Sequence, residues 1–203
     1  TIIAMSTLDT THTRQNLMLG AVLVAAVLCT PYTTQAQNLL PNPGFEETDS
    51  CTFGLGLGEL HHWFSAFGTP DHLQGCLPYG SANGLPLNIF TYQFPYEGSS
   101  CAGIFTYDAS SGQEWREWLM VPLLDTLVPG HTYYCSFSAN AGFGGNGSTL
   151  NWLASDHLGM LFTTYDRQWA WGDPYPQALD QAHILHPQIL SDTVGWTLVS
   201  GSF

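Results

Sequence analysis

Residues 37 to 203 contain no long stretch in which apolar side chains recur with the period of a helix. Their apolar residues come instead in short runs, separated by Gly, Pro and Asn, which favour turns. The run 131–138 alternates, with Tyr133, Cys135 and Phe137 on one face. Several short strands between turn residues predict an all-β fold, a β-sandwich whose two sheets bury their inner faces, with the jelly roll as the expected form.

Other runs of the same kind predict further strands over 101–107, 115–121, 158–164 and 197–199. Two long stretches are predicted to be loops. The first, 139–151, is rich in Gly and Asn, which adopt unusual backbone angles at low cost. The second, 166–191, carries aromatic rings among prolines and polar residues.

The first 36 residues have the order of features found in a secretory signal. Arg14 precedes an apolar run over 17–29, and small residues stand three and one before a cut after Ala36. That run is shorter than the about 20 residues that span a bilayer. We therefore expect a signal peptide with upstream residues over 1–36, one β-sandwich domain over 37–203, and a secreted or outer-surface location.

The two ends of the sequence predict that it is part of a longer protein. The chain begins with Thr1 rather than Met, and its final run, 196–203, resembles an unfinished strand. We accordingly expect the last strand of the sandwich to be missing, together with any downstream domain.

The charge of the chain restricts its partners. Sixteen Asp and Glu residues face three basic residues, which gives a formal net charge of −13. After Ala36 the basic residues are Arg116 and Arg167, and no Lys occurs. Nucleic acids and anionic membrane surfaces are bound through Lys and Arg, so we expect neither as a partner.

Four cysteines follow Ala36, and an even number in an exported chain favours disulfides. Three pairings are open. We favour Cys51 with Cys76, which share a loop-rich region, and Cys101 with Cys135, which lie in strand-like runs. The absence of a Cys-x-x-Cys spacing disfavours a zinc site.

Several motifs, taken in order, resemble a known family. They are Asn-Leu-Leu-Pro-Asn-Pro-Gly-Phe-Glu at 38–46, Ala-Gly-Ile-Phe-Thr-Tyr at 102–107, Trp-Arg-Glu-Trp at 115–118, Leu-Val-Pro-Gly-His-Thr-Tyr at 127–133 and the run 196–203. The order resembles the N-terminal galactose-binding-like jelly-roll domain of exported Bacteroidota surface proteins, which are cargo of type IX secretion and include gliding-associated and OmpA-like proteins.

The resemblance implies a sandwich like that of carbohydrate-binding modules. In such modules the Glu of this opening often helps to hold a structural calcium ion, a role that would fall to Glu46. A second ligand would come from the last strand. The resemblance implies a place at the cell surface more firmly than an activity.

Glycan binding is the chemistry that the residues suggest most directly. Aromatic rings stack on the apolar faces of sugars, and carboxylates or amides bind the hydroxyl groups. The loop 166–191 offers Trp169, Trp171 and Tyr175 with Asp173 as a candidate site. The alternative interpretation is that these rings pack down to hold the long loop in place.

Two catalytic interpretations are weaker. Glu114 and Glu117 flank Arg116, but on a strand these two carboxylates would point to opposite faces, which argues against glycoside hydrolysis by the pair. The chain has no Gly-x-Ser-x-Gly elbow. The histidines do not follow a metalloenzyme template.

We therefore expect a non-catalytic recognition module that binds an extracellular glycan or a component of the cell envelope. The alternatives are a structural spacer without a small ligand and, less favoured, a glycoside or ester hydrolase.

Overall fold

The computed structural model describes residues 4–7, 37–108, 115–147, 154–165 and 182–203. Within these residues the fold is all-β and contains no helix. The nine strands are β1 (Ala4–Thr7), β2 (Phe64–Phe67), β3 (Asp71–Gln74), β4 (Ser100–Gly103), β5 (Trp118–Met120), β6 (Tyr133–Ala139), β7 (Leu158–Met160), β8 (Ile184–His186) and β9 (Thr197–Ser202). The expectation of an all-β chain is confirmed.

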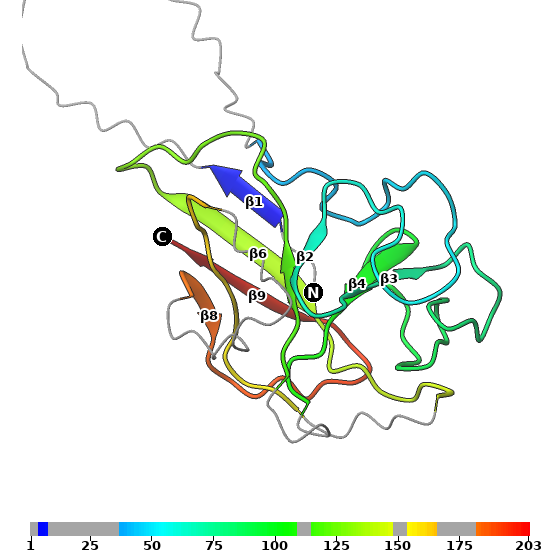
Figure 1. Ribbon diagram of the computed structural model, residues 1–203. Coiled ribbons are helices and arrows are strands. Elements are labelled where there is room, and N and C mark those ends of the chain that lie inside the picture. The colour runs from blue at the N-terminus through cyan, green and yellow to red at the C-terminus, as the bar shows by residue number, and fades with distance from the viewer. Residues whose placement is uncertain (1–3, 8–36, 109–114, 148–153, 166–181) are drawn as a thin grey trace, which may run out of the picture.

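Every pairing between these strands is antiparallel. The largest sheet has the order β1-β6-β9 (Figure 1). Three two-stranded sheets pair β2 with β5, β3 with β4, and β7 with β8. β6 is therefore the central strand of the main sheet, with β1 along one edge and β9 along the other. No helix among the described residues is long and apolar enough to cross a bilayer.

The alternation predicted in the run 131–138 is confirmed in β6. Tyr133, Cys135 and Phe137 are buried, whereas Tyr134 and Ser136 between them are only partly buried. The buried face of β6 packs with Val199 of β9 and with Met160 of β7 in the first of three core clusters. The pleat places one side of a seven-residue strand into the core, so this element sets the position of the main sheet.

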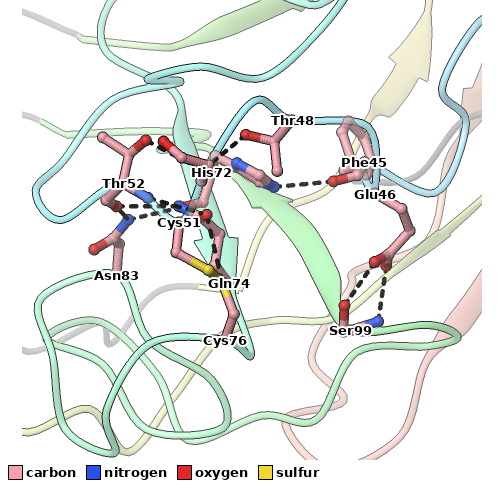
Figure 2. Close-up of a disulfide and its surroundings, with 11 residues drawn as sticks. Phe45, Glu46, Thr48, Cys51, Thr52, His72, Gln74, Cys76, Asn83 and Ser99 are labelled. Atoms are coloured by element: carbon pink, nitrogen blue, oxygen red, sulfur yellow. Dashed lines mark hydrogen bonds between the residues drawn. A yellow bond between two sulfur atoms is a disulfide. The ribbon is translucent and has the colours of Figure 1, made fainter.

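The predicted strand runs do not include four of the observed strands, namely β1, β2, β3 and β8. β3 is Asp-His-Leu-Gln, which carries three polar side chains, and yet all four of its residues are buried. The polar groups of β3 are satisfied by neighbouring loops: the His72 ring bonds to the carbonyl of Phe45, and Gln74 bonds to the backbone of Thr52 (Figure 2). β8 lies in a stretch that the sequence predicts to be loop.

The loop-rich first part of the domain is held by covalent and polar contacts. Cys51 and Cys76 form a disulfide, as predicted. Beside it, the Asn83 side-chain amide donates to the carbonyls of Thr52 and His72 (Figure 2). Because buried polar groups must find partners, this network fixes a loop that contains little apolar surface of its own.

The second predicted disulfide is wrong. Cys101 and Cys135 are free and buried, in β4 and β6 respectively. Cys135 belongs to the cluster with Phe137, and Cys101 to a separate cluster with Leu73 and Leu85. Burial raises the pKa of each thiol to about 11. Each cysteine therefore behaves as a small apolar core residue rather than as a crosslink.

Candidate functional site

The sequence predicts a glycan-binding site on the loop 166–191. Trp169, Trp171, Asp173 and Tyr175 all lie outside the described residues. The described part of the chain carries a different group of exposed aromatic rings, and this group forms the candidate site.

Three rings and a valine surround a depression of about 430 Å³. Tyr92 is 47% exposed, Phe94 61% and Phe143 49%, and Val194 is exposed as well. We call these four residues the aromatic face. The depression is lined by Tyr92, Gln93, Phe94, Phe143, Gly144, Thr193 and Val194. Large rings left in water around a concavity mark a binding surface more often than singly scattered apolar residues do.

The segment 91–96 presents its rings outward because its side chains alternate. Thr91 and Gln93 are buried, whereas Tyr92, Phe94 and Tyr96 are exposed. The Tyr92 and Phe94 rings meet edge to face, with centroids 6.0 Å apart. Tyr96 in turn meets Trp196, with their ring centroids 6.3 Å apart.

The inward side chains of this segment bind it to the loop 192–196. The Gln93 side-chain nitrogen donates to the carbonyls of Phe94 at 3.1 Å and Val194 at 3.3 Å. The Trp196 indole also donates to the carbonyl of Phe94 at 3.1 Å. Since Trp196 packs against two of the core clusters, the rings of the face rest on the interior of the domain.

The glycine-rich stretch 139–147 supplies the third side of the site. The Phe143 carbonyl accepts from the Tyr92 amide at 2.7 Å and from the Thr91 hydroxyl at 3.1 Å. The Thr91 hydroxyl oxygen in turn accepts from the Phe143 amide at 3.1 Å. Any side chain at Gly145 or Gly147 would collide with the backbone of residues 89 and 90. The glycines therefore permit the close approach that brings Phe143 beside Tyr92.

A tight turn at Asp192 shapes the last loop. One carboxylate oxygen of Asp192 accepts from the amides of Val194 at 2.9 Å and Gly195 at 2.8 Å, and its carbonyl accepts from the Ala141 amide at 2.8 Å. The two amides lower the pKa of the Asp192 carboxyl. This exposed group thus remains ionised at neutral pH and places a negative charge on the loop that carries Val194.

Comparisons with family models, with curated proteins and with solved structures found no match for this chain. The aromatic face presents flat rings on two loops and a valine on a third, and hydrogen bonds tie these three loops together. Within the segments 89–96, 139–147 and 189–196 there is no Lys, Arg or His. Such a surface can stack on an apolar ligand face but lacks cationic groups for binding a phosphate or carboxylate.

The surroundings of Glu46 do not fit the calcium ion that the resemblance implies. Its carboxylate already accepts from the Ser99 amide at 2.7 Å and the Ser99 hydroxyl at 2.6 Å (Figure 2). It also accepts from the Ser100 amide at 2.9 Å. Calcium requires six to eight oxygen ligands. Among the described residues no group of three His, Cys, Asp or Glu side chains gathers at one place. Glu46 therefore serves as a clamp between two loops.

A second depression, of about 370 Å³, lies next to two buried carboxylates. Asp71 accepts from the Gly56 amide at 2.6 Å, and Glu117 accepts from the Thr69 amide, the Thr69 hydroxyl and the Phe105 amide. Burial, with a smaller contribution from the nearby Glu117 charge, raises the pKa of Asp71 to about 6, although the hydrogen bond from the Gly56 amide lowers it. These hydrogen bonds give both carboxylates a structural function that orders the loops around them.

Two histidines and an arginine also have partners in the structure. His61 and His62 bond to Asp49 at 2.8 Å and Glu47 at 3.5 Å. The Arg116 guanidinium lies over the Tyr107 ring at 5.4 Å from its centroid. Glu114, the proposed partner of Glu117, lies outside the described residues.

The aromatic face was missed at the sequence level although a signal for it exists. Tyr92, Phe94 and Tyr96 recur at every second position around Pro95. That spacing places three rings on one side of an extended segment. The contributions of Phe143 and Val194 had no such signal, because they reach the site only through long-range hydrogen bonds.

Proposed function

We propose that this chain is a non-catalytic recognition module that binds extracellular glycans through the aromatic face. The observation that carries the proposal is the convergence of Tyr92, Phe94 and Phe143 around one depression, with about half or more of each ring in water. Sugar rings present apolar C–H surfaces that stack on such side chains.

The hydrogen bonds beneath the face support recognition rather than an incidental apolar patch. The Gln93 side chain donates to the Val194 carbonyl at 3.3 Å, and the Thr91 hydroxyl donates to the Phe143 carbonyl at 3.1 Å. The Tyr92 amide also donates to the Phe143 carbonyl, at 2.7 Å. These bonds hold the loops of the aromatic face together from beneath. A surface fixed before binding loses little conformational entropy when the ligand arrives.

We place the module in a secreted or cell-surface protein, with a jelly-roll β-sandwich of the galactose-binding type as its fold. The antiparallel all-β architecture and the order of motifs that resembles exported Bacteroidota proteins support this assignment. The Cys51–Cys76 disulfide is compatible with an oxidising, extracellular environment.

A hydrolase is less well supported by the carboxylates that the structure describes. Glu117 and Asp71 are each buried and accept hydrogen bonds from backbone amides of neighbouring loops. These hydrogen bonds give both carboxylates a structural role. The other alternative, a spacer module without a small ligand, does not account for three exposed rings around one depression.

A glycan array probed with the full chain and with a Tyr92→Ala/Phe94→Ala variant tests the proposal. We expect the wild type to bind at least one class of glycan and the variant to lose that binding. Phe53→Ala is a matched control, because Phe53 is 68% exposed and does not line the depression. No glycan bound by the wild type, or equal binding by the double variant, would contradict the proposal and favour the spacer.

A further inference from the structure

We propose that the aromatic face selects uncharged glycans and that Asp192 is the residue that rejects anionic ones. This inference rests on the proposed glycan-binding function and specifies its ligand class. It follows from the charges that the three loops of the site do and do not carry.

The first observation is the charge composition of the loops. The segments 89–97, 139–147 and 189–196 contain two charged residues, Glu97 and Asp192, and both are acidic. Uronate and sulfate groups are recognised by Arg and Lys, which offer charge-assisted hydrogen bonds. A ligand with such groups would lose water at this face and find no cation in these loops to replace it.

The second observation is the fixed position of the Asp192 charge. Asp192 is directly followed by Thr193 and Val194, which line the depression. Its carboxylate is held by the amides of Val194 and Gly195, and these bonds lower its pKa. The negative charge is therefore present at neutral pH and held in a defined orientation, one residue before the lining of the depression begins at Thr193.

The overall charge acts in the same direction at longer range. With a formal net charge of −13, the chain repels a polyanion before contact, and salt weakens this repulsion over the Debye length of about 8 Å. A neutral glycan is not repelled by the net charge and does not have to desolvate an anionic group, so it keeps the full stacking energy on Tyr92, Phe94 and Phe143.

The structure offers an isosteric test of this specificity. Asp192→Asn keeps the side-chain oxygen that accepts from Val194 and Gly195, so the turn is preserved while the charge is removed. Asp192→Lys reverses the charge. We would measure binding of the full chain to pairs of probes that share a backbone and differ chiefly in charge, namely methyl-esterified and de-esterified homogalacturonan, and hydroxyethyl and carboxymethyl cellulose.

We expect the wild type to bind the neutral member of at least one pair more tightly than the anionic member at low salt. Asp192→Asn should leave neutral binding unchanged and strengthen anionic binding by about fivefold at most, the scale of one unit-charge contact in water. Asp192→Lys should strengthen anionic binding further, and raised salt should reduce both gains.

The possible outcomes separate the two proposals. Equal or tighter binding of the anionic members by the wild type would overturn the inference about charge while leaving glycan binding intact. An unchanged anionic affinity in both Asp192 variants, with their folds confirmed by circular dichroism, would remove Asp192 as the specificity residue. No binding to any probe would count against the glycan-binding function itself.

Discussion

The side-chain nitrogen of Gln93 donates a hydrogen bond of 3.3 Å to the backbone carbonyl of Val194, a residue 101 positions further along the chain. The same nitrogen donates to the carbonyl of Phe94 at 3.1 Å. One buried amide thus connects two of the three loops that form the aromatic face. The arrangement of the exposed rings therefore depends on a buried side chain.

Replacing Gln93 by Leu tests this dependence. The variant keeps the side-chain volume but removes the donor from two carbonyls, so we expect the free energy of unfolding to fall by about 1–3 kcal/mol. Urea unfolding followed by tryptophan fluorescence measures the loss, and glycan affinity should fall with it. Gln188→Leu is the control, because Gln188 is exposed. Equal stability of the two variants would show that the Gln93 bonds do not support the face.

The disulfide gives a second prediction. Cys51 and Cys76 are 25 residues apart, and closing such a loop stabilises a folded chain by about 3 kcal/mol. We expect Cys51→Ser/Cys76→Ser to lose a comparable free energy of unfolding and to show faster amide exchange in 52–58.

Alkylation of the native wild type provides the complementary measurement. Burial and a pKa of about 11 should protect Cys101 and Cys135 until the protein is denatured. A Cys101–Cys135 peptide linked by a disulfide in a mass-spectrometric map would contradict the structure.

Asp71 predicts a dependence of stability on pH. Its pKa rises from 3.8 unfolded to about 6 folded, chiefly because the carboxyl is buried, with Glu117 as the nearby charge. The folded state therefore binds the proton more tightly, and the stability contributed by this group falls as pH rises from about 4 to about 6. Asp71→Asn keeps an acceptor for the Gly56 amide but cannot ionise.

We expect the unfolding free energy of Asp71→Asn, relative to wild type, to increase by up to about 3 kcal/mol between pH 4 and pH 7. Parallel urea titrations at the two pH values measure this difference, in which other titrating groups cancel. A difference that does not change with pH would show that Asp71 is not desolvated in the folded protein.

Substitution of Glu46 tests whether its carboxylate has a structural role. Glu46→Gln leaves one acceptor oxygen for the donors of Ser99 and Ser100, so we expect a loss of about 1 kcal/mol in unfolding free energy. Millimolar calcium or EDTA should leave the Tm of the wild type unchanged. A rise in Tm with calcium that Glu46→Gln abolishes would instead establish the ion that the resemblance implies.

The parts of the fold that the sequence predicted are those in which local pattern and burial agree. β6 was foreseen because its apolar side chains alternate, and Tyr133, Cys135 and Phe137 are indeed buried. β3 was missed because Asp71, His72 and Gln74 are polar, and their burial depends on partners in distant loops.

The same distinction explains the cysteines and the site. Cys51 and Cys76 lie in neighbouring loops, whereas Cys101 and Cys135 occupy different core clusters, a separation that strand-like patterns cannot reveal. The aromatic face joins Phe94, Phe143 and Val194 from three distant segments. Spacing along the chain could indicate the rings near Pro95 but not the contacts that complete the depression.

Chemical-shift mapping with the neutral glycan that binds best on the array tests most directly whether the aromatic face is the binding site. In two-dimensional NMR spectra of labelled protein, we expect the largest ligand-induced shifts at the amides of 91–96, 141–147 and 192–196, saturating with one binding constant. Shifts confined to 51–58, to 166–181 or to no single region would contradict the claim that the aromatic face is the binding site.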